Sequence, residues 1–358
     1  MIDKNRYRSV GGRLLLTLAV LAGSTAFITP KASAEIIWST ATGGAVDSSP
    51  YVTNGVVYVG SDDGWVYALN AATGQIVWQT LTTSPLNPTG AAVDSSPAVV
   101  NGVVYVGSDN GWVYALNATT GQIVWQTLTT AVGVPAGAVN SSPAVVNGVV
   151  YVGSDNGLVN ALSAATGQVL WQTLTGGAVK SSPYVANGIL YVGSDNGSIY
   201  ALNAATGQVL WQTLTGGAVR SSPYVINGIL YVGSDDGNTY ALNAATGQVL
   251  WKTLTGAAVD SSPFVVNGIL YVGSGDGSVY ALDAATGLGL WQTLTGGAVD
   301  SSPFVLNGIL YVGSDDGRIY ALNAINAAAV PEPSTLALLA LALAGFGFSR
   351  RRKQVSWV

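Results

Sequence analysis

The stretch that decides the fold is residues 98–126, which read AVVNGVVYVGSDNGWVYALNATTGQIVWQ. It contains four short runs rich in β-branched and aromatic residues, at 98–100, 103–107, 112–116 and 122–126. The pairs Asn101-Gly102, Asn110-Gly111 and Thr120-Gly121 separate these runs, and Gly allows the positive φ that a tight turn requires. The stretch therefore predicts four antiparallel strands joined by hairpin turns.

The same pattern recurs along the whole chain. A tyrosine opens a YVGS or similar segment seven times, at Tyr58, Tyr105, Tyr151, Tyr191, Tyr231, Tyr271 and Tyr311. The spacings are 47, 46, 40, 40, 40 and 40 residues, and a period near 40 is typical of β-propellers. WD40 propellers share this period, but their Gly-His dipeptide does not occur in a chain without His.

The fourth run of the repeat, which contains Trp, follows only six of the seven repeats. Its seventh copy stands at the other end of the chain, where residues 36–40 read IIWST and match IVWQT at 76–80. An N-terminal strand that completes the last blade closes a ring and leaves no exposed sheet edge there. The sequence therefore predicts an all-β fold, a seven-bladed β-propeller closed by an N-terminal strand.

Six tryptophans hold equivalent places in the repeat: Trp78, Trp125, Trp171, Trp211, Trp251 and Trp291. One bulky aromatic side chain per blade is best explained by packing between neighbouring blades. We therefore assign these tryptophans to the framework and not to a binding site.

The amino-acid composition excludes several classes of catalytic and metal-binding site. The chain has no Cys and no His, which excludes disulfides, thiol nucleophiles, His-containing triads and the usual zinc sites. Residues 35–326 carry sixteen acidic and four basic side chains, a net charge of −12, so nucleic acid is not expected as a partner. We expect a protein that is not an enzyme and has no catalytic, cofactor-binding or metal-binding residues.

The N-terminal segment has the features of a signal peptide. Basic residues precede the apolar run 14–22, and Ala32-Ser33-Ala34 provides a small-residue cleavage site. We therefore predict a signal peptide over residues 1–34 and a propeller domain over residues 35–326.

The C-terminal segment, residues 327–358, has three parts. Val330-Pro331-Glu332-Pro333-Ser334 is followed by the apolar run 336–348 and a basic cluster at 350–353. The apolar run predicts a short hydrophobic helix, below the roughly 17 residues usual for a membrane span. The three parts resemble a PEP-CTERM sorting tail, which implies export in a Gram-negative bacterium and location at the cell surface, outer envelope or extracellular matrix. The resemblance also implies exosortase-type processing, transient or permanent membrane association through the tail, and exopolysaccharide or surface proteins as partners.

Acidic residues concentrate on one expected face. In an up-and-down blade, the turns between the second and third strands emerge on the same side as the connections between blades, and fourteen of the sixteen acidic residues fall there. Seven positions before the SSP motif form a candidate ring at the channel mouth: Asp47, Asp94, Asn140, Lys180, Arg220, Asp260 and Asp300. Two interpretations of these acidic residues remain open. Either they are turn-forming residues that were copied when the repeat was duplicated, or they attract cations or basic partners.

The first repeats depart from the later ones on this same face. Only the first two turns have Trp after Gly, and only the first two connections between blades are lengthened, over 83–89 and 130–135. These departures give a candidate ligand patch: Trp65, Trp112, Leu86, Pro88, Val134 and Pro135. Exposed Trp suits sugar rings, whereas drift after an early duplication is the alternative.

The segment ALNATTGQIVW at 115–125 resembles the repeat of PQQ-type quinoprotein propellers, and the resemblance extends over residues 36–324. This repeat builds both PQQ-dependent dehydrogenases and binding-only propellers, such as the periplasmic scaffold of outer-membrane protein assembly. The dehydrogenases have eight blades and a Glu/Asn/Asp calcium cluster, whereas Glu35 is the only Glu of this ring. The assembly scaffold has a lipid-anchor Cys, which this chain lacks.

Three functions follow as expectations. The favoured one is an exported, non-catalytic interaction scaffold of the cell surface or matrix, for polysaccharide or protein partners. The alternatives are a PQQ-dependent dehydrogenase and an envelope-assembly scaffold.

Overall fold

The computed structural model describes residues 36–84 and 89–324. The chain divides into two compact units, Met1–Ile37 and Trp38–Val358, and the described residues of the first unit belong to no strand or helix. The predicted signal peptide, the C-terminal helix, Leu86 and Pro88 lie outside the described residues. Within the described ranges, no helix has the length and apolar character needed to cross a membrane.

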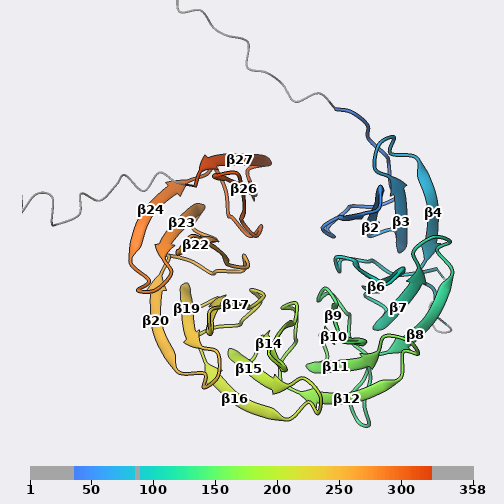
Figure 1. The fold of residues 1–358 in the computed structure, drawn as a ribbon, viewed down its shortest axis with the longest axis horizontal. Coiled ribbons are helices and arrows are strands. Elements are labelled where there is room, and N and C mark those ends of the chain that lie inside the picture. The colour runs from blue at the N-terminus through green and yellow to red at the C-terminus, as the bar shows by residue number, and fades with distance from the viewer. Residues whose placement is uncertain (1–35, 85–88, 325–358) are drawn as a thin grey trace, which may run out of the picture. The chain divides into compact units, whose positions relative to one another are not determined.

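The second unit consists of antiparallel sheets, called blades 1 to 7 here, which follow one another in chain order (Figure 1). Blade 1 contains β1 (Tyr51–Thr53), β2 (Val56–Gly60), β3 (Trp65–Asn70) and β4 (Ile76–Leu81). Blade 2 contains β5 (Ala98–Val100), β6 (Val103–Gly107), β7 (Trp112–Asn117) and β8 (Ile123–Leu128). Blade 3 contains β9 (Ala144–Val146), β10 (Val149–Gly153), β11 (Leu158–Ser163) and β12 (Val169–Leu174). Blade 4 contains β13 (Tyr184–Ala186), β14 (Ile189–Ser194), β15 (Ser198–Asn203) and β16 (Val209–Leu214).

The last three blades continue the pattern. Blade 5 contains β17 (Tyr224–Ile226), β18 (Ile229–Gly233), β19 (Asn238–Asn243) and β20 (Val249–Leu254). Blade 6 contains β21 (Phe264–Val266), β22 (Ile269–Gly273), β23 (Ser278–Asp283) and β24 (Gly289–Leu294). Blade 7 contains β25 (Phe304–Leu306), β26 (Ile309–Ser314) and β27 (Arg318–Asn323). The prediction of a seven-bladed, all-β propeller is confirmed.

Local sequence explains why each blade forms. The first turn of blade 2 places Asn101 at φ 52° and Gly102 at φ 78°, the left-handed conformation that a two-residue hairpin needs. Asn is tolerated there because its short side chain suits the left-handed region. The third and fourth strands of blade 2 pair with a register shift at Ala115 and Leu116, a β-bulge that recurs in all six four-stranded blades.

The hydrophobic core lies between neighbouring blades. At the junction of blades 2 and 3, Trp125 Nε1 donates a 2.9 Å hydrogen bond to the Ala164 carbonyl, and Tyr105 OH donates to the same oxygen at 3.1 Å. The rings of Tyr105 and Trp125 lie 5.9 Å apart. Both side chains are buried. The predicted packing role of the repeated tryptophans is confirmed.

The predicted closing strand is not formed in this structure. Trp38 Nε1 donates to the Ala71 carbonyl at 3.0 Å and Thr40 Oγ1 donates to the Gly74 carbonyl at 2.5 Å, so this segment rests on blade 1. Residues 36–42 form no strand, and blade 7 has three strands in the described part of the chain. The expectation of a closed ring is corrected in this respect, because the contacts of Trp38 and Thr40 with blade 1 form without any pairing to β27.

Candidate binding surface

The acidic turns between the second and third strands contain two kinds of acid. The residue just before the turn glycine, which is Asp in blades 1, 5, 6 and 7 and Asn in the others, is structural. In blade 5, Asp236 accepts hydrogen bonds from the backbone N–H groups of Asn238 at 2.9 Å and Gly216 at 2.9 Å, and from Tyr240 OH. Burial opposes ionisation of Asp236, but these hydrogen bonds together hold its pKa below the usual value. Turn chemistry therefore accounts for this position.

The residue one position earlier is Asp in every turn but that of blade 6, and it lies close to the connections between blades. Asp94 of the predicted ring lies against Asp62 of blade 1, and burial, followed by the charges of Asp109, Asp62 and Asp47, raises the pKa of Asp94 to about 6. Asp260 is the equivalent case, since burial and then its hydrogen bond with Asp235 raise the pKa of Asp260 to about 6. The structure thus brings ring residues and turn acids together at the blade junctions.

Basic residues relieve this crowding at two positions of the ring. Arg220 bridges Asp195 at 3.4 Å and Asp235 at 2.8 Å. Lys180 lowers the pKa of Asp155, although burial outweighs it and leaves that pKa raised. The ring is therefore acidic on one part of its circumference and neutralised on another. Among the described residues, no group of three or more acidic side chains is placed to hold a metal ion.

Trp65 and Trp112 are half-buried at the first residues of β3 and β7. Each stands opposite a leucine that ends the outermost strand, Leu81 and Leu128 respectively. These two leucines are half-buried, whereas the equivalent leucines of blades 4 to 6 stand opposite Ser or Asn and are 69–72% exposed. The two tryptophans thus cover apolar surface and present only part of each ring to solvent.

The second long connection borders a hollow. Val134 and Pro135 line a depression of about 380 Å³ together with Asp155, Asn156 and Leu174. Asn156 Nδ2 donates to the Pro135 carbonyl at 2.9 Å, which fixes the connection against the turn of blade 3. Neither Trp65 nor Trp112 lines this hollow. The described members of the candidate patch therefore form separate features of one face.

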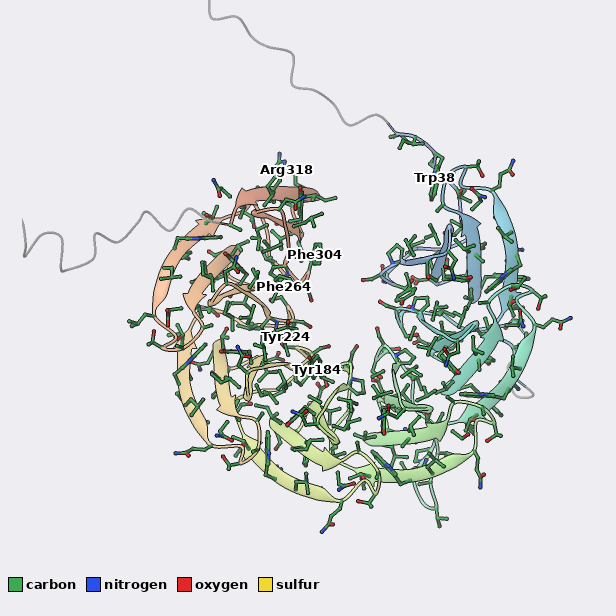
Figure 2. The ribbon with its side chains drawn as sticks, in the orientation of Figure 1. Trp38, Tyr184, Tyr224, Phe264, Phe304 and Arg318 are labelled. Carbon is green, nitrogen blue, oxygen red and sulfur yellow. The ribbon has the colours of Figure 1, made fainter. Side chains whose placement is uncertain are left out.

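A row of aromatic rings on the innermost strands was not identified from the sequence. Figure 2 labels the four residues of this row, which lie on consecutive blades: Tyr184, Tyr224, Phe264 and Phe304. The ring centroids of successive members are 5.8, 6.3 and 5.5 Å apart. The signal was the residue after each SSP motif, which is Tyr or Phe in blades 1 and 4 to 7 and Ala in blades 2 and 3. The inner strands thus carry contacting aromatic rings along blades 4 to 7.

Solved structures of three proteins are similar to this chain. They are BamB from Moraxella catarrhalis (24% identity, 80% of this chain and 88% of that chain, TM-score 0.69), a europium-containing methanol dehydrogenase (16%, 76% and 72%, TM-score 0.60), and the computationally designed protein Ika8 (18%, 78% and 96%, TM-score 0.50). At these identities the likeness shows the fold alone. No curated protein matches the chain.

Two family models match the chain itself. The PEP-CTERM protein-sorting motif matches residues 329–353, so the protein is exported, is located in the envelope of a Gram-negative bacterium, and carries the signal for exosortase processing. The second model is described as outer membrane protein assembly factor BamB and matches residues 10–157, 109–226, 155–264 and 198–332. These matches together run from residue 10 to residue 332, and the chain therefore belongs to the BamB family of propeller proteins.

Proposed function

We propose that this exported propeller is a non-catalytic binding scaffold of the cell surface or extracellular matrix, with exopolysaccharide or surface proteins as partners. One contrast carries the proposal: the blade junctions repeat the same contacts, whereas blades 1 to 3 vary on the acidic face. That face holds Trp65, Trp112 and the hollow beside Val134 and Pro135. Loops on a rigid scaffold are where binding residues concentrate.

A binding role also agrees with the side chains available. A chain without His or Cys lacks the usual acid, base and nucleophile pairs. The inner strands present Ala98, Ala144 and mutually packed aromatic rings, and the described acids form no group that could hold a calcium ion. These residues do not fit a calcium-bound quinone, which favours binding over dehydrogenase chemistry.

Glycan-array binding tests the proposal directly. The double variant Trp65→Ala plus Trp112→Ala should lose at least tenfold in affinity for the polysaccharide that the wild type binds, because two partly exposed rings are removed. Leu214→Ala, an exposed residue of blade 4, is the matched control and should bind as the wild type does. An unchanged profile for the double variant contradicts a role for these tryptophans.

Family membership favours a second candidate, an envelope-assembly scaffold. Co-purification of outer-membrane assembly components with the native protein would support that role, and their absence alongside glycan binding would favour the first. Reconstitution with PQQ and calcium, followed by an alcohol or sugar oxidation assay, distinguishes both from a dehydrogenase.

A further inference from the structure

Asp283 is an exception in the repeat, and it lies on the face opposite to the acidic turns. It ends β23, the third strand of blade 6, at a position where the other blades have Asn or Ser. No other residue is charged in the turns that join the first strand to the second or the third strand to the fourth. Because Trp65 begins a third strand and Asp283 ends one, the two residues lie on opposite faces of the blades.

The carboxylate of Asp283 is only half engaged by its own turn. Its Oδ1 atom accepts from the backbone N–H groups of Ala285 at 3.1 Å and Thr286 at 2.8 Å, and from Thr286 Oγ1 at 2.7 Å. Asn243 accepts the two equivalent backbone bonds in blade 5, at 3.0 and 3.1 Å, so an amide is enough for this turn. Among the described residues, none donates to Oδ2 of Asp283. The negative charge is therefore not required by the turn, and one carboxylate oxygen is available to a ligand.

A hollow of about 430 Å³ lies beside Asp283, at the junction of blades 5 and 6. Ile226, Ile229 and Val266 belong to its apolar lining, and all three side chains are half-buried. Pockets for small molecules typically have about 300–1,000 Å³ and are mostly apolar, with a few polar groups that orient the ligand. The size and lining of this hollow therefore suit a small ligand with an apolar body.

The polar groups of the hollow include no cation. Asn227 and Asn267 line it from the hairpin turns of blades 5 and 6, and neither side-chain amide is bonded to another described residue. Tyr231 OH donates to the Ala284 carbonyl at 2.9 Å, and burial, followed by the charge of Asp283, raises the pKa of Tyr231. The charge of Asp283 therefore acts on the hollow without a neutralising partner among the lining residues.

We propose that this hollow binds a small organic ammonium ion. The ammonium group pairs with Oδ2 of Asp283, and the apolar body of the ligand packs on Ile226, Ile229 and Val266. Charge complementarity selects this class of ligand, since an anion would be repelled and a hydrocarbon would cover the carboxylate without offering it a partner. The site lies on the face opposite to Trp65 and does not depend on the proposed function.

The neighbouring junction offers a comparison within the same molecule. A hollow of about 370 Å³ between blades 6 and 7 has an apolar lining that includes Val266, Ile269 and Val305. The residue equivalent to Asp283 at this junction is Asn323. The size and the apolar lining recur but the carboxylate does not, so we expect this hollow to bind the ammonium ligand more weakly.

Titration of the full-length protein with phenethylammonium tests the site, with NMR of the isoleucine methyl groups as the readout. About 0.15 M salt screens attraction of the ligand to the acidic face. The methyl resonances of Ile226 and Ile229 should shift together and saturate, whereas that of Ile123, on the outer strand of blade 2, should not move. Phenethyl alcohol, the uncharged counterpart, should bind about tenfold more weakly, because it cannot form a charge-assisted hydrogen bond with Asp283.

Asp283→Asn should weaken the binding of phenethylammonium by about tenfold and leave the Tm unchanged, because Asn is the residue of this turn in other blades. The matched control, Asp315→Asn, removes a carboxylate from the acidic face and should bind as the wild type does. Equal affinities of the wild type and Asp283→Asn, or shifts confined to residues of the acidic face, would overturn the proposal.

The converse variant is Asn323→Asp, which places a carboxylate beside the hollow between blades 6 and 7. The Ile269 methyl resonance, which reports on that hollow, should then respond at about tenfold lower ligand concentration than in the wild type. An unchanged response of Ile269 would contradict the role assigned to the carboxylate.

Discussion

The junctions between blades and the acidic face of blades 1 to 3 carry different kinds of tryptophan. Trp125, at a junction, is buried and bonded to the Ala164 carbonyl, whereas Trp112 of the same blade is half-buried opposite Leu128. The position of Trp125 is Trp in six blades and packs at the blade junctions, fully buried in blades 1 and 2 and partly buried in blades 3 to 6, whereas the position of Trp112 is Trp only twice. Repetition therefore marks residues that build the ring, and departure from it marks residues that are available for binding.

Removal of one tryptophan of each kind gives the largest expected difference. Trp125→Ala should lower the free energy of unfolding by about 3–5 kcal/mol, because it leaves a cavity between blades 2 and 3. Trp112→Ala should cost about 1 kcal/mol, since the ring is only half-buried. Urea unfolding followed by circular dichroism measures both. Equal decreases in the free energy of unfolding would contradict the distinction between framework and surface tryptophans.

The glycines of the junctions test the same contrast at smaller scale. Gly193→Ala should cost about 1–3 kcal/mol, because the added methyl group meets the backbone of Val219. Gly313→Ala, at the equivalent position of blade 7, should cost less than about 1 kcal/mol, because a Cβ there comes near only Ser301, at 3.3 Å. The measurement is the midpoint of urea unfolding for both variants. Equal losses for the two variants would contradict the difference in packing between Gly193 and Gly313.

Strand positions could be predicted closely from the sequence. The runs 98–100 and 103–107 coincide with β5 and β6, because β-branched residues and Asn-Gly turns set those limits locally. The repeat also predicted the Trp packing, since one large ring per blade has to be buried somewhere. Closure was predicted from the match of residues 36–40 to 76–80, yet those residues form no strand in the structure.

The surface was less predictable because it depends on neighbours across strands. Trp65 shields Leu81 because β3 pairs with β4. The register of this pairing shifts at a β-bulge that could not be predicted from the sequence. The crowding of Asp94 against Asp62 likewise depends on how one blade meets the next. The aromatic row was visible in the residue after SSP, but its ring contacts require the spacing of neighbouring blades.

Acid crowding at the junctions gives the smallest predicted effect, a dependence of stability on pH. The pKa values of Asp94 and Asp260 are both raised to about 6, so the folded protein holds protons more tightly than the unfolded chain, in which Asp titrates near 3.9. Stability should therefore be highest below pH 4 for these two groups and should fall as the pH rises from about 4 to 6. Solvent screens both carboxyl groups because they are partly exposed, which reduces the effect.

Thermal unfolding between pH 4 and pH 7 measures this dependence. The Tm of the wild type should fall by about 2–4 °C over that range from these groups, the shift that roughly 1 kcal/mol produces in a domain of this size. Asp94→Asn should flatten the profile, because the amide does not ionise. Asn140→Asp adds a carboxyl group at an equivalent ring position and should steepen it. If both variants reproduced the wild-type profile, the acidic ring would have no part in stability, and its carboxylates would be turn residues copied with the repeat.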